Sequence, residues 1–523
     1  MKEFIEKHSD RISGVLSGLD RVRFRGTFRH LAVAVLLERW LSHRHVLMKD
    51  FKPFVEGITA SLKATIESYA TARGRAIRYL ESSAISKEDL VKELIRRESL
   101  TDGLVCVLSA VEPCRSYEIV RNPKTKTLDL CAALRKCLHW YVYLLHPLLG
   151  LCHVRIQSWL PLTIHVCVNG REMLCRQLTN QGIGFERRDN CLASVDDIKL
   201  AQSLLDGQPW LHWGDLLTGL VRDVCPPLLE LPYFEDRLQP YWSADETEYA
   251  TDVMFNSSKE LAELYPSLLR HSMTTFGSPQ VLRFLGKTRI PKDGVDPRFK
   301  GELTTRLTTR PEGICVKHRM NRNSIKMYDK QGSVLRIETT INDTRDFQVF
   351  RNTEAEAADV PKRWLRLRKG VVDLPRRCEV SHSANNRYLT AQASVDVATP
   401  LGEITDRLAT PVISRGHRSR GLNPMSGIDA ELVKILLQGE FTINGFRNRN
   451  LRDALFGQTT DPAEHRRQSG RITRLLRLFV DHGLVSKVVK THRYQLTPEG
   501  RRLLPSFATA RAASTQKLAD LAA

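Results

Sequence analysis

The clearest periodic pattern lies in the last hundred residues, where apolar residues recur at helical spacing between strong helix boundaries. The spacing predicts helices over about 429–438 and 448–456, each followed by a glycine. Asp461-Pro462 supplies an N-cap and an N1 proline, so a third helix is expected to begin there. Two short strands, 484–489 and 493–496, and a last short helix should follow. This order is typical of a winged helix-turn-helix whose wing is the basic turn 490–492.

Basic side chains follow the same elements. The third helix places Ile472, Leu475 and Phe479 on one face and arginines on the other. A helix with such a basic face suits the groove of DNA, because it brings cations to the phosphates. The residues expected to bind nucleic acid here are Arg447, Arg449, Arg466, Arg467, Arg471, Arg474, Arg477, Lys487, Lys490, His492 and Arg493.

The rest of the chain mixes strand and helix patterns. Strands are expected at 21–28 and 103–111 and helices at 50–73 and 86–97. Further on, the patterns predict an aromatic helix around Trp140, a strand pair at 153–159 and 162–168, and a helix at 171–180. Residues 196–282 are interpreted as mainly helical. The prediction is an α+β multidomain protein, divided into a mixed N-terminal domain 1–125, a mixed domain 126–310, a β-rich segment 311–404 completing it, a basic linker 405–424, a winged helix 425–507 and a tail 508–523.

Charge changes this picture more than length or hydrophobicity does. The 523 residues carry a net charge of +20, and 19 of the basic residues against nine acidic ones fall in 411–523. Such a charge favours a polyanion partner, because each neutralised phosphate releases counterions. The sequence shows no apolar run of membrane-spanning length and begins with a charged segment, so we expect no membrane partner and a cytoplasmic location. The odd number of cysteines, eleven, without CxxC spacing indicates reduced thiols.

The densest polar pattern, residues 316–342, predicts three strands with turns at 321–323 and 330–333. Along the last strand Arg336 and Glu338 share one face, but the register of the hairpins stays open. Such a face suits phosphodiester chemistry: Glu338 and His318 could hold Mg²⁺ or Mn²⁺, and Tyr328 could be a nucleophile. The candidate catalytic residues are Glu338, Tyr328, Asp329 and His318, and those expected to neutralise phosphate are Lys326, Lys330 and Arg336. The alternative is that this polar face packs on a neighbouring domain, or touches phosphate without catalysing a reaction.

Two resemblances bear on this segment and on the chain. The run Lys326-Met327-Tyr328-Asp329-Lys330, followed by Leu335-Arg336-Ile337-Glu338, is similar to a stretch in rolling-circle replication initiators. That resemblance implies DNA nicking by a tyrosine with a bound divalent metal, although the paired-histidine strand of those proteins is missing. The whole chain resembles a group of uncharacterised bacterial proteins with a C-terminal winged helix, through stretches such as 153–157, 248–252 and 445–449. That second resemblance implies no activity.

The sequence also bears on other chemistries. Asp20, Asp252 and Glu338 could form a three-carboxylate site like that of RNase H-like transposases, although that fold has its third acid on a helix. The chain contains no P-loop, no strand-linked GxGxxG, no HExxH and no GxSxG, which disfavours ATP-driven and Rossmann chemistry.

The sequence therefore predicts a DNA-binding protein, of the kind that mobile elements use for strand nicking or transposition. The alternative is a non-enzymatic winged-helix transcriptional regulator, and an RNA-binding protein is a third. The roughly 400 residues ahead of the winged helix favour the first, whereas the incomplete catalytic signature favours the second. DNA is the expected partner, RNA and a homodimer stay open, and Mg²⁺ or Mn²⁺ is expected only if the protein is an enzyme.

Overall fold

The computed structural model describes residues 1–82, 84–233, 236–286, 301–310, 313–351, 363–393, 401–414, 416–438, 441, 445–488 and 491–514. These fall into two compact units. The sheet unit comprises His8–Leu261 and Leu307–Arg387, and the helical unit comprises Met1–Lys7, Ala262–Arg306 and Tyr388–Ala523. The chain is thus an α+β protein with more than one unit, as its sequence predicted.

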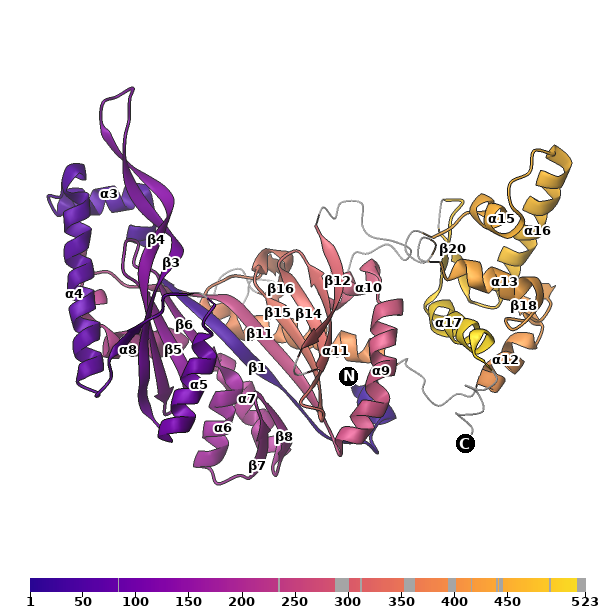
Figure 1. Cartoon of the computed structure of the whole chain (residues 1–523), viewed down its shortest axis with the longest axis horizontal. Coiled ribbons are helices and arrows are strands. Elements are labelled where there is room, and N and C mark those ends of the chain that lie inside the picture. The colour runs from indigo at the N-terminus through magenta and orange to yellow at the C-terminus, as the bar shows by residue number, and fades with distance from the viewer. Residues whose placement is uncertain are drawn as a thin grey trace. The chain divides into compact units, whose positions relative to one another are not determined.

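One sheet of eleven strands dominates the sheet unit (Figure 1). Every neighbouring pair whose register is described is antiparallel, except β2 with β3. In spatial order the strands are β12 (Leu303–Arg310), β13 (Gly313–Met320), β14 (Asn323–Lys330), β15 (Val334–Ile341), β11 (Tyr241–Phe255), β1 (Ile12–Thr27), β6 (Ile164–Asn169), β5 (Gly150–Gln157), β4 (Leu128–His146), β3 (Gly103–Arg121) and β2 (Ile77–Tyr79).

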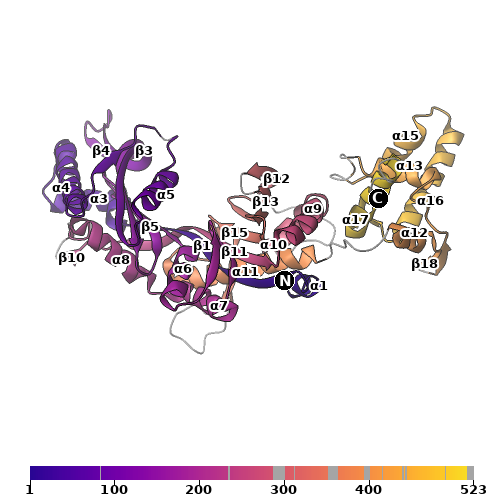
Figure 2. The ribbon, with the colours of Figure 1, turned by 60° about the horizontal axis from the view of Figure 1, so that its bottom comes forward.

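The two faces of the sheet differ in what covers them. The core face carries Phe24 and its partner Val166, and it packs against α3 (Ala34–His43), α4 (Phe51–Thr71), α8 (Trp213–Val224) and the start of α11 (Leu374–Gln392). The opposite face, here called the polar face, packs at one end against α6 (Gly170–Asn180) and α7 (Ile198–Gly207), which lie side by side next to β1 (Figure 2). At the β3–β4 end it packs against α5 (Lys87–Glu98). Between these helices the polar face borders a cavity.

Smaller elements complete the two units. In the sheet unit they are α2 (Arg29–Ala32) and three short strand pairs: β7 (Phe185–Arg188) with β8 (Cys191–Val195), β9 (Pro232–Tyr233) with β10 (Asp236–Arg237), and β16 (Gln348–Arg351) with β17 (Arg363–Arg366). The remaining elements are α1 (Lys2–Lys7), α9 (Ser258–Thr275), α10 (Ser278–Phe284), α12 (Leu401–Ala409), β18 (Val412–Ser414), β19 (His417–Ser419), α13 (Gly427–Leu436), α15 (Asn448–Phe456), α16 (Pro462–Asp481), β20 (Val485–Lys487), β21 (Tyr494–Leu496) and α17 (Pro498–Ala512).

Three sequence interpretations of the larger unit are wrong. The segment around Trp140 is strand β4 rather than a helix, and β11 runs through a region expected to be mainly helical. In the supposedly β-rich segment, α11 is a 19-residue helix. The error at Trp140 has a physical cause. Residues 139–145 are buried on both faces of the sheet, so the alternation that marks a half-buried strand is absent.

The domain boundaries also need correction. Strands β3 and β4 pair along their whole length, so the boundary after residue 125 cuts a hairpin. The sheet likewise continues from β12 to β13 across the boundary at 310. The expected basic linker 405–424 is folded, because Leu408 and Leu422 belong to the hydrophobic core of the C-terminal helices and the Leu422 amide donates to the Leu408 carbonyl. Helix α17 continues five residues past the expected end at 507.

A tight junction between β6 and α6 yields the first testable prediction. The Asn169 side chain caps α6, and a Cβ added at Gly170 would lie 2.2 Å from the Leu19 carbonyl oxygen of β1. Gly170→Ala should therefore lower the free energy of unfolding by about 1–3 kcal/mol, the usual cost of overpacking. Gly219→Ala is the matched control: this α8 position has open space, so alanine should stabilise by up to about 1 kcal/mol. Urea unfolding of both variants measures this, and equal midpoints would contradict it.

Candidate functional site

The hairpin registers decide which polar residues meet. On β15, Glu338 lies opposite Lys326 of β14 and Ala250 of β11, and Thr340 lies opposite Ser324 and Glu248. Directly paired residues of antiparallel strands point to the same side of a sheet. Lys326, Glu338, Thr340 and Glu248 therefore share the polar face.

A bulge in β1 adds a further carboxylate. The pairing with β11 jumps from Leu19 opposite Tyr249 to Val22 opposite Thr247, so Asp20 and Arg21 together face Glu248. An extra residue in one strand breaks the alternation and re-aims the side chains next to it. Both Asp20 and Arg21 consequently project from the polar face, beside Glu248.

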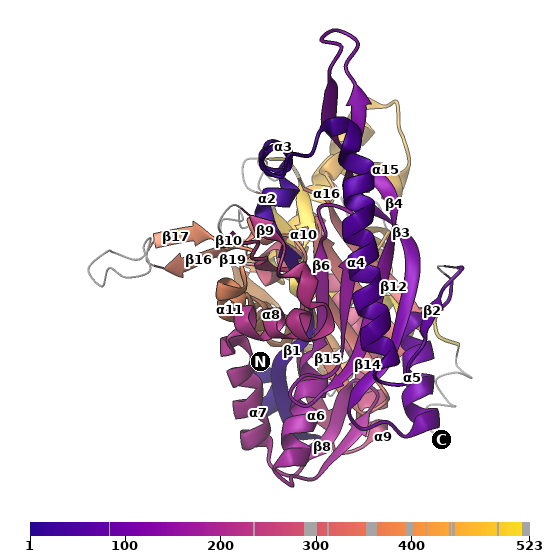
Figure 3. The same ribbon diagram turned by 90° about the vertical axis from the view of Figure 1, so that its left-hand side faces the viewer.

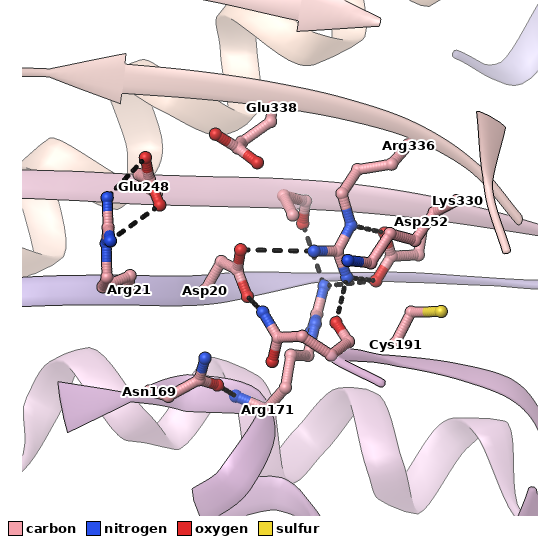
Figure 4. A network of polar contacts seen from close by, with 12 residues as sticks. Asp20, Arg21, Asn169, Arg171, Cys191, Glu248, Asp252, Lys330, Arg336 and Glu338 are labelled. Atoms are coloured by element: carbon pink, nitrogen blue, oxygen red, sulfur yellow. Dashed lines mark hydrogen bonds and ion pairs between the residues drawn. The ribbon is translucent and has the colours of Figure 1, made fainter. Parts of the chain in front are cut away.

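Three carboxylates converge at this point. One oxygen each from Asp20, Glu248 and Glu338 lies within 4.8 Å of the other two. Figure 4 shows the three side chains directed toward a common space from β1, β11 and β15. They line a cavity of about 690 Å³ that also reaches Lys92 of α5 and Asp189 between β7 and β8. A pocket of this size with several convergent charged groups is the usual form of a ligand site.

Cations and a phenol hold two of these carboxylates in place. Lys326 Nζ donates to Glu338 Oε1 at 2.6 Å, and the Tyr328 hydroxyl donates to Glu338 Oε2 at 2.7 Å. Arg21 contacts both oxygens of Glu248, at 3.2 and 3.3 Å, and Lys326 Nζ lies 3.6 Å from its Oε1. Lys326 thus lies between two of the three acids.

Asp252, which the sequence suggested as a third acid, belongs to a neighbouring ion-pair network. Arg336 is 1% exposed and binds both oxygens of Asp252, at 2.6 and 2.9 Å. It also donates to Asp20 Oδ2 at 3.2 Å, and Arg171 forms an ion pair with Asp252 at 3.0 Å. Because these cations neutralise Asp252, it lies outside the three-carboxylate cluster.

The three carboxyls of the cluster differ in how readily they ionise. Burial raises the pKa of Glu248 to about 7, and the facing Glu338 carboxylate adds to the rise. Burial also raises the pKa of Asp20, even though Arg336 is nearby. The pKa of Glu338 moves the other way: burial opposes its ionisation, but the Lys326 ammonium, the Arg336 guanidinium and the Tyr328 hydroxyl together outweigh burial and lower the pKa to about 2. One stable anion beside two carboxyls that resist ionisation is a setting in which a divalent cation would be stabilising.

A second polar group points to a ligand in the same space. Thr340 is 5% exposed, lies opposite Glu248 and lines the cavity. Its hydroxyl has no hydrogen-bond partner among the described residues. A buried hydroxyl without a partner is costly, whereas a metal-bound water or a phosphate oxygen would satisfy it.

Two predicted catalytic residues do not reach the site. His318 lies opposite Ile325, so it points to the core face, where burial lowers its pKa to about 4. Asp329 lies opposite Leu335 and accepts a hydrogen bond from the Gly332 amide at the turn. The prediction of a Glu338–His318 metal pair is therefore wrong, because the two side chains point to opposite faces of the sheet.

The three phosphate-binding residues predicted in the hairpin lie in different surroundings. Lys326 and Lys330 line the cavity, and Lys330 pairs with Asp189 at 2.8 Å. Arg336 is fully engaged by buried carboxylates, so the expectation that it contacts nucleic acid is wrong. Its role in the structure is to hold Asp20 and Asp252.

Glu248 is the functional candidate that the sequence reasoning missed. It lies in β11, which was interpreted as helical, so its strand alternation was not used. In Glu246-Thr247-Glu248-Tyr249 the acidic side chains alternate with Thr and Tyr, and this is the available signal. The three-carboxylate alternative of the sequence analysis did place Asp20 and Glu338 in one site.

The C-terminal basic residues lie largely where the sequence placed them. Arg447 is half-buried and Lys490 lies outside the described residues. Arg467 forms an ion pair with Glu464 at 2.8 Å, and Arg471 stacks over Phe456. The exposed residues of the set are Arg449, Arg466, Arg467, Arg471, Arg474, Arg477, Lys487, His492 and Arg493.

Comparisons of the chain with protein families, curated proteins and solved structures found no match. Among the described residues, no helix combines the length and apolar character needed to cross a membrane.

The raised pKa of Glu248 gives a prediction for the metal-free protein. Because the folded-state pKa of about 7 exceeds the ordinary 4.5, protonated Glu248 stabilises the fold, and that contribution is lost as pH rises between these values. Glu248→Gln mimics the protonated form. Its free energy of unfolding should match the wild type at the acidic end of this range and exceed it at pH about 8. Urea unfolding in chelator across that range measures the difference, and parallel curves would contradict the assignment.

Proposed function

We propose that this protein processes DNA by metal-dependent phosphodiester chemistry on the polar face of its sheet. The observation that carries the proposal is the convergence of Asp20, Glu248 and Glu338 beside the unpartnered hydroxyl of Thr340. These three carboxylates would hold Mg²⁺ or Mn²⁺, which prefer oxygen ligands. The cation would stabilise the charge that develops on a phosphate and lower the pKa of a bound water.

The side chains around the carboxylates suit a phosphate. Lys326 and Lys330 line the cavity and present ammonium groups to it, and Lys326 also holds Glu338 in its ionised form. Burial and the Glu338 carboxylate raise the pKa of Tyr328 well above its ordinary value. A phenol that keeps its proton is a weak nucleophile. Water is therefore the favoured attacking group, and Tyr328 is proposed as the residue that positions Glu338.

The C-terminal helices are proposed as a winged helix that anchors the DNA. Helices α13, α15 and α16, hairpin β20–β21 and helix α17 follow in the order of that module. Helix α16 buries Ile472 and Phe479 and exposes its arginines, and Asp461 caps its first turn. We propose α16 as the recognition helix and the β20–β21 turn as the wing.

Strand nicking or transfer, as in proteins of mobile elements, is the proposed reaction class, and the local resemblance to rolling-circle initiators agrees with it. A non-enzymatic regulator is the second candidate. The observation that favours it is the satisfied state of Glu338, which pairs with Lys326 and Tyr328 without any ligand. RNA in place of DNA is tested by the same assays.

The carboxylate variants test the chemistry. Glu338→Gln and Glu248→Gln should each lower Mg²⁺- or Mn²⁺-dependent cleavage of single-stranded or nicked DNA by about 100-fold or more, because each removes one charge that holds the cation. DNA affinity should stay nearly unchanged. Calorimetric titration with Mn²⁺ gives a readout independent of activity, and both variants should bind the ion more weakly.

Asp329→Asn is the matched control, since Asp329 lies on the neighbouring strand but points to the other face. It should retain cleavage and metal binding. Tyr328→Phe separates two routes: a covalent tyrosyl–DNA adduct would vanish, whereas hydrolysis by water would survive. If the wild type cleaves neither DNA nor RNA with either metal, the regulator becomes the preferred function.

The arginines of α16 test the anchoring role. Arg471→Ala with Arg474→Ala should weaken duplex DNA binding by roughly 1–3 kcal/mol for each lost contact. The wild-type affinity should also fall steeply as salt rises, because phosphate contacts release counterions. Fluorescence anisotropy at several salt concentrations measures both effects.

The control for this experiment removes the same charge elsewhere. Arg39 and Arg44 are exposed near the end of α3, so their double alanine variant lowers the net charge equally. It should bind nearly as tightly as the wild type. Equal losses in the two double variants would mean that net charge, rather than α16, determines the affinity.

A further inference from the structure

A small β-ribbon stands apart from the large sheet. Strands β16 and β17 pair only with each other, with Phe350 opposite Trp364 and Gln348 opposite Arg366. Figure 3 shows this ribbon extending outward from the sheet unit, on the side of α11. At its base the Leu367 amide donates to the Phe347 carbonyl, and both side chains are buried. The ribbon is thus anchored at its base and carries exposed side chains on both strands.

The outer face of the ribbon is aromatic. Trp364 is 64% exposed and Phe350 is 56% exposed, and their ring centroids are 5.6 Å apart. Alternation puts Val349, which is buried, on the inner face. A two-stranded ribbon gains little stability by holding two large rings in water, so an exposed aromatic pair marks a binding surface.

Positive charge surrounds the pair. Arg363, Arg366 and Arg368 are exposed, and none of them forms an ion pair with another residue that the structure describes. Arg351, by contrast, is neutralised by Asp373 at 3.5 Å. The uncompensated guanidinium groups therefore lie on the strand that carries Trp364 and just after it.

We propose that the β16–β17 ribbon binds single-stranded DNA. Bases would stack on Trp364 and Phe350, and Arg366, next to them on the same face, would contact the backbone phosphates. Aromatic faces accept any unstacked base, and free arginines meet the phosphates between bases. Duplex DNA hides its base faces inside the stack, so the chemistry of this surface selects the single strand. The site is separate from the carboxylate cluster and needs no metal.

The experiment uses the full chain and fluorescent oligo(dT) in chelator, with anisotropy as the readout. Trp364→Ala should weaken binding by roughly tenfold or more, the loss expected for one base–aromatic stack. Phe350→Ala should act in the same direction, and Trp364→Tyr should restore most of the affinity because it keeps an aromatic face. Arg366→Ala should weaken binding and reduce its salt dependence.

Trp210→Ala is the matched control, because Trp210 is also a surface tryptophan of the sheet unit, 70% exposed and far along the chain. It should bind oligo(dT) like the wild type, and none of the ribbon variants should change duplex affinity. Unchanged oligo(dT) affinity in Trp364→Ala, or equal losses in Trp210→Ala, would overturn the proposal. Stronger binding of oligo(U) than oligo(dT) would assign the ribbon to RNA instead. Because chelator is present, failure of metal-dependent cleavage has no bearing on this result.

Discussion

Arg336 is a positive charge buried in the sheet unit, and the geometry of the polar face depends on it. Its guanidinium binds Asp252 on β11, Asp20 on β1 and the Asn190 carbonyl before β8. These contacts link β15 to two strands and to a loop that borders the cavity. A buried ion pair that loses one partner leaves an unpaired charge, at a cost of several kcal/mol. The register of the three strands and the positions of the carboxylates are therefore coupled.

The bulge in β1 has a complementary effect. A regular strand would turn Arg21 to the core face, where Phe24 packs among aromatic and aliphatic side chains. The extra residue keeps both Asp20 and Arg21 on the polar face, so Arg21 can neutralise Glu248 while Asp20 approaches Glu338. The same irregularity thus supplies one acid of the cluster and a cation that stabilises another.

The sequence predicted local structure better than long-range pairing. The cap at Asp461 and the turns on either side of β14 lie where the patterns placed them, because each depends on a few neighbouring residues. Pairing across hundreds of residues leaves no such local signal. Glu248 was missed because β11 was interpreted as helical. His318 was placed with Glu338 because the hairpin registers, which decide the face that each side chain occupies, were left open. The face shared by Arg336 and Glu338 was correctly predicted from alternation alone.

The separation of the contacts along the chain has a consequence for synthesis of the protein. The hydrogen bond between Arg336 and Asp20 joins residues 316 positions apart, and β15 is the last of the inner strands to be made. Until the ribosome has released the segment through Ile341, β1 and β11 lack the cation that neutralises Asp20 and Asp252. A nascent chain of this topology exposes unpaired strand edges for a long interval, a state prone to aggregation. The sheet can therefore close around Arg336 only after about two thirds of the chain has been synthesised.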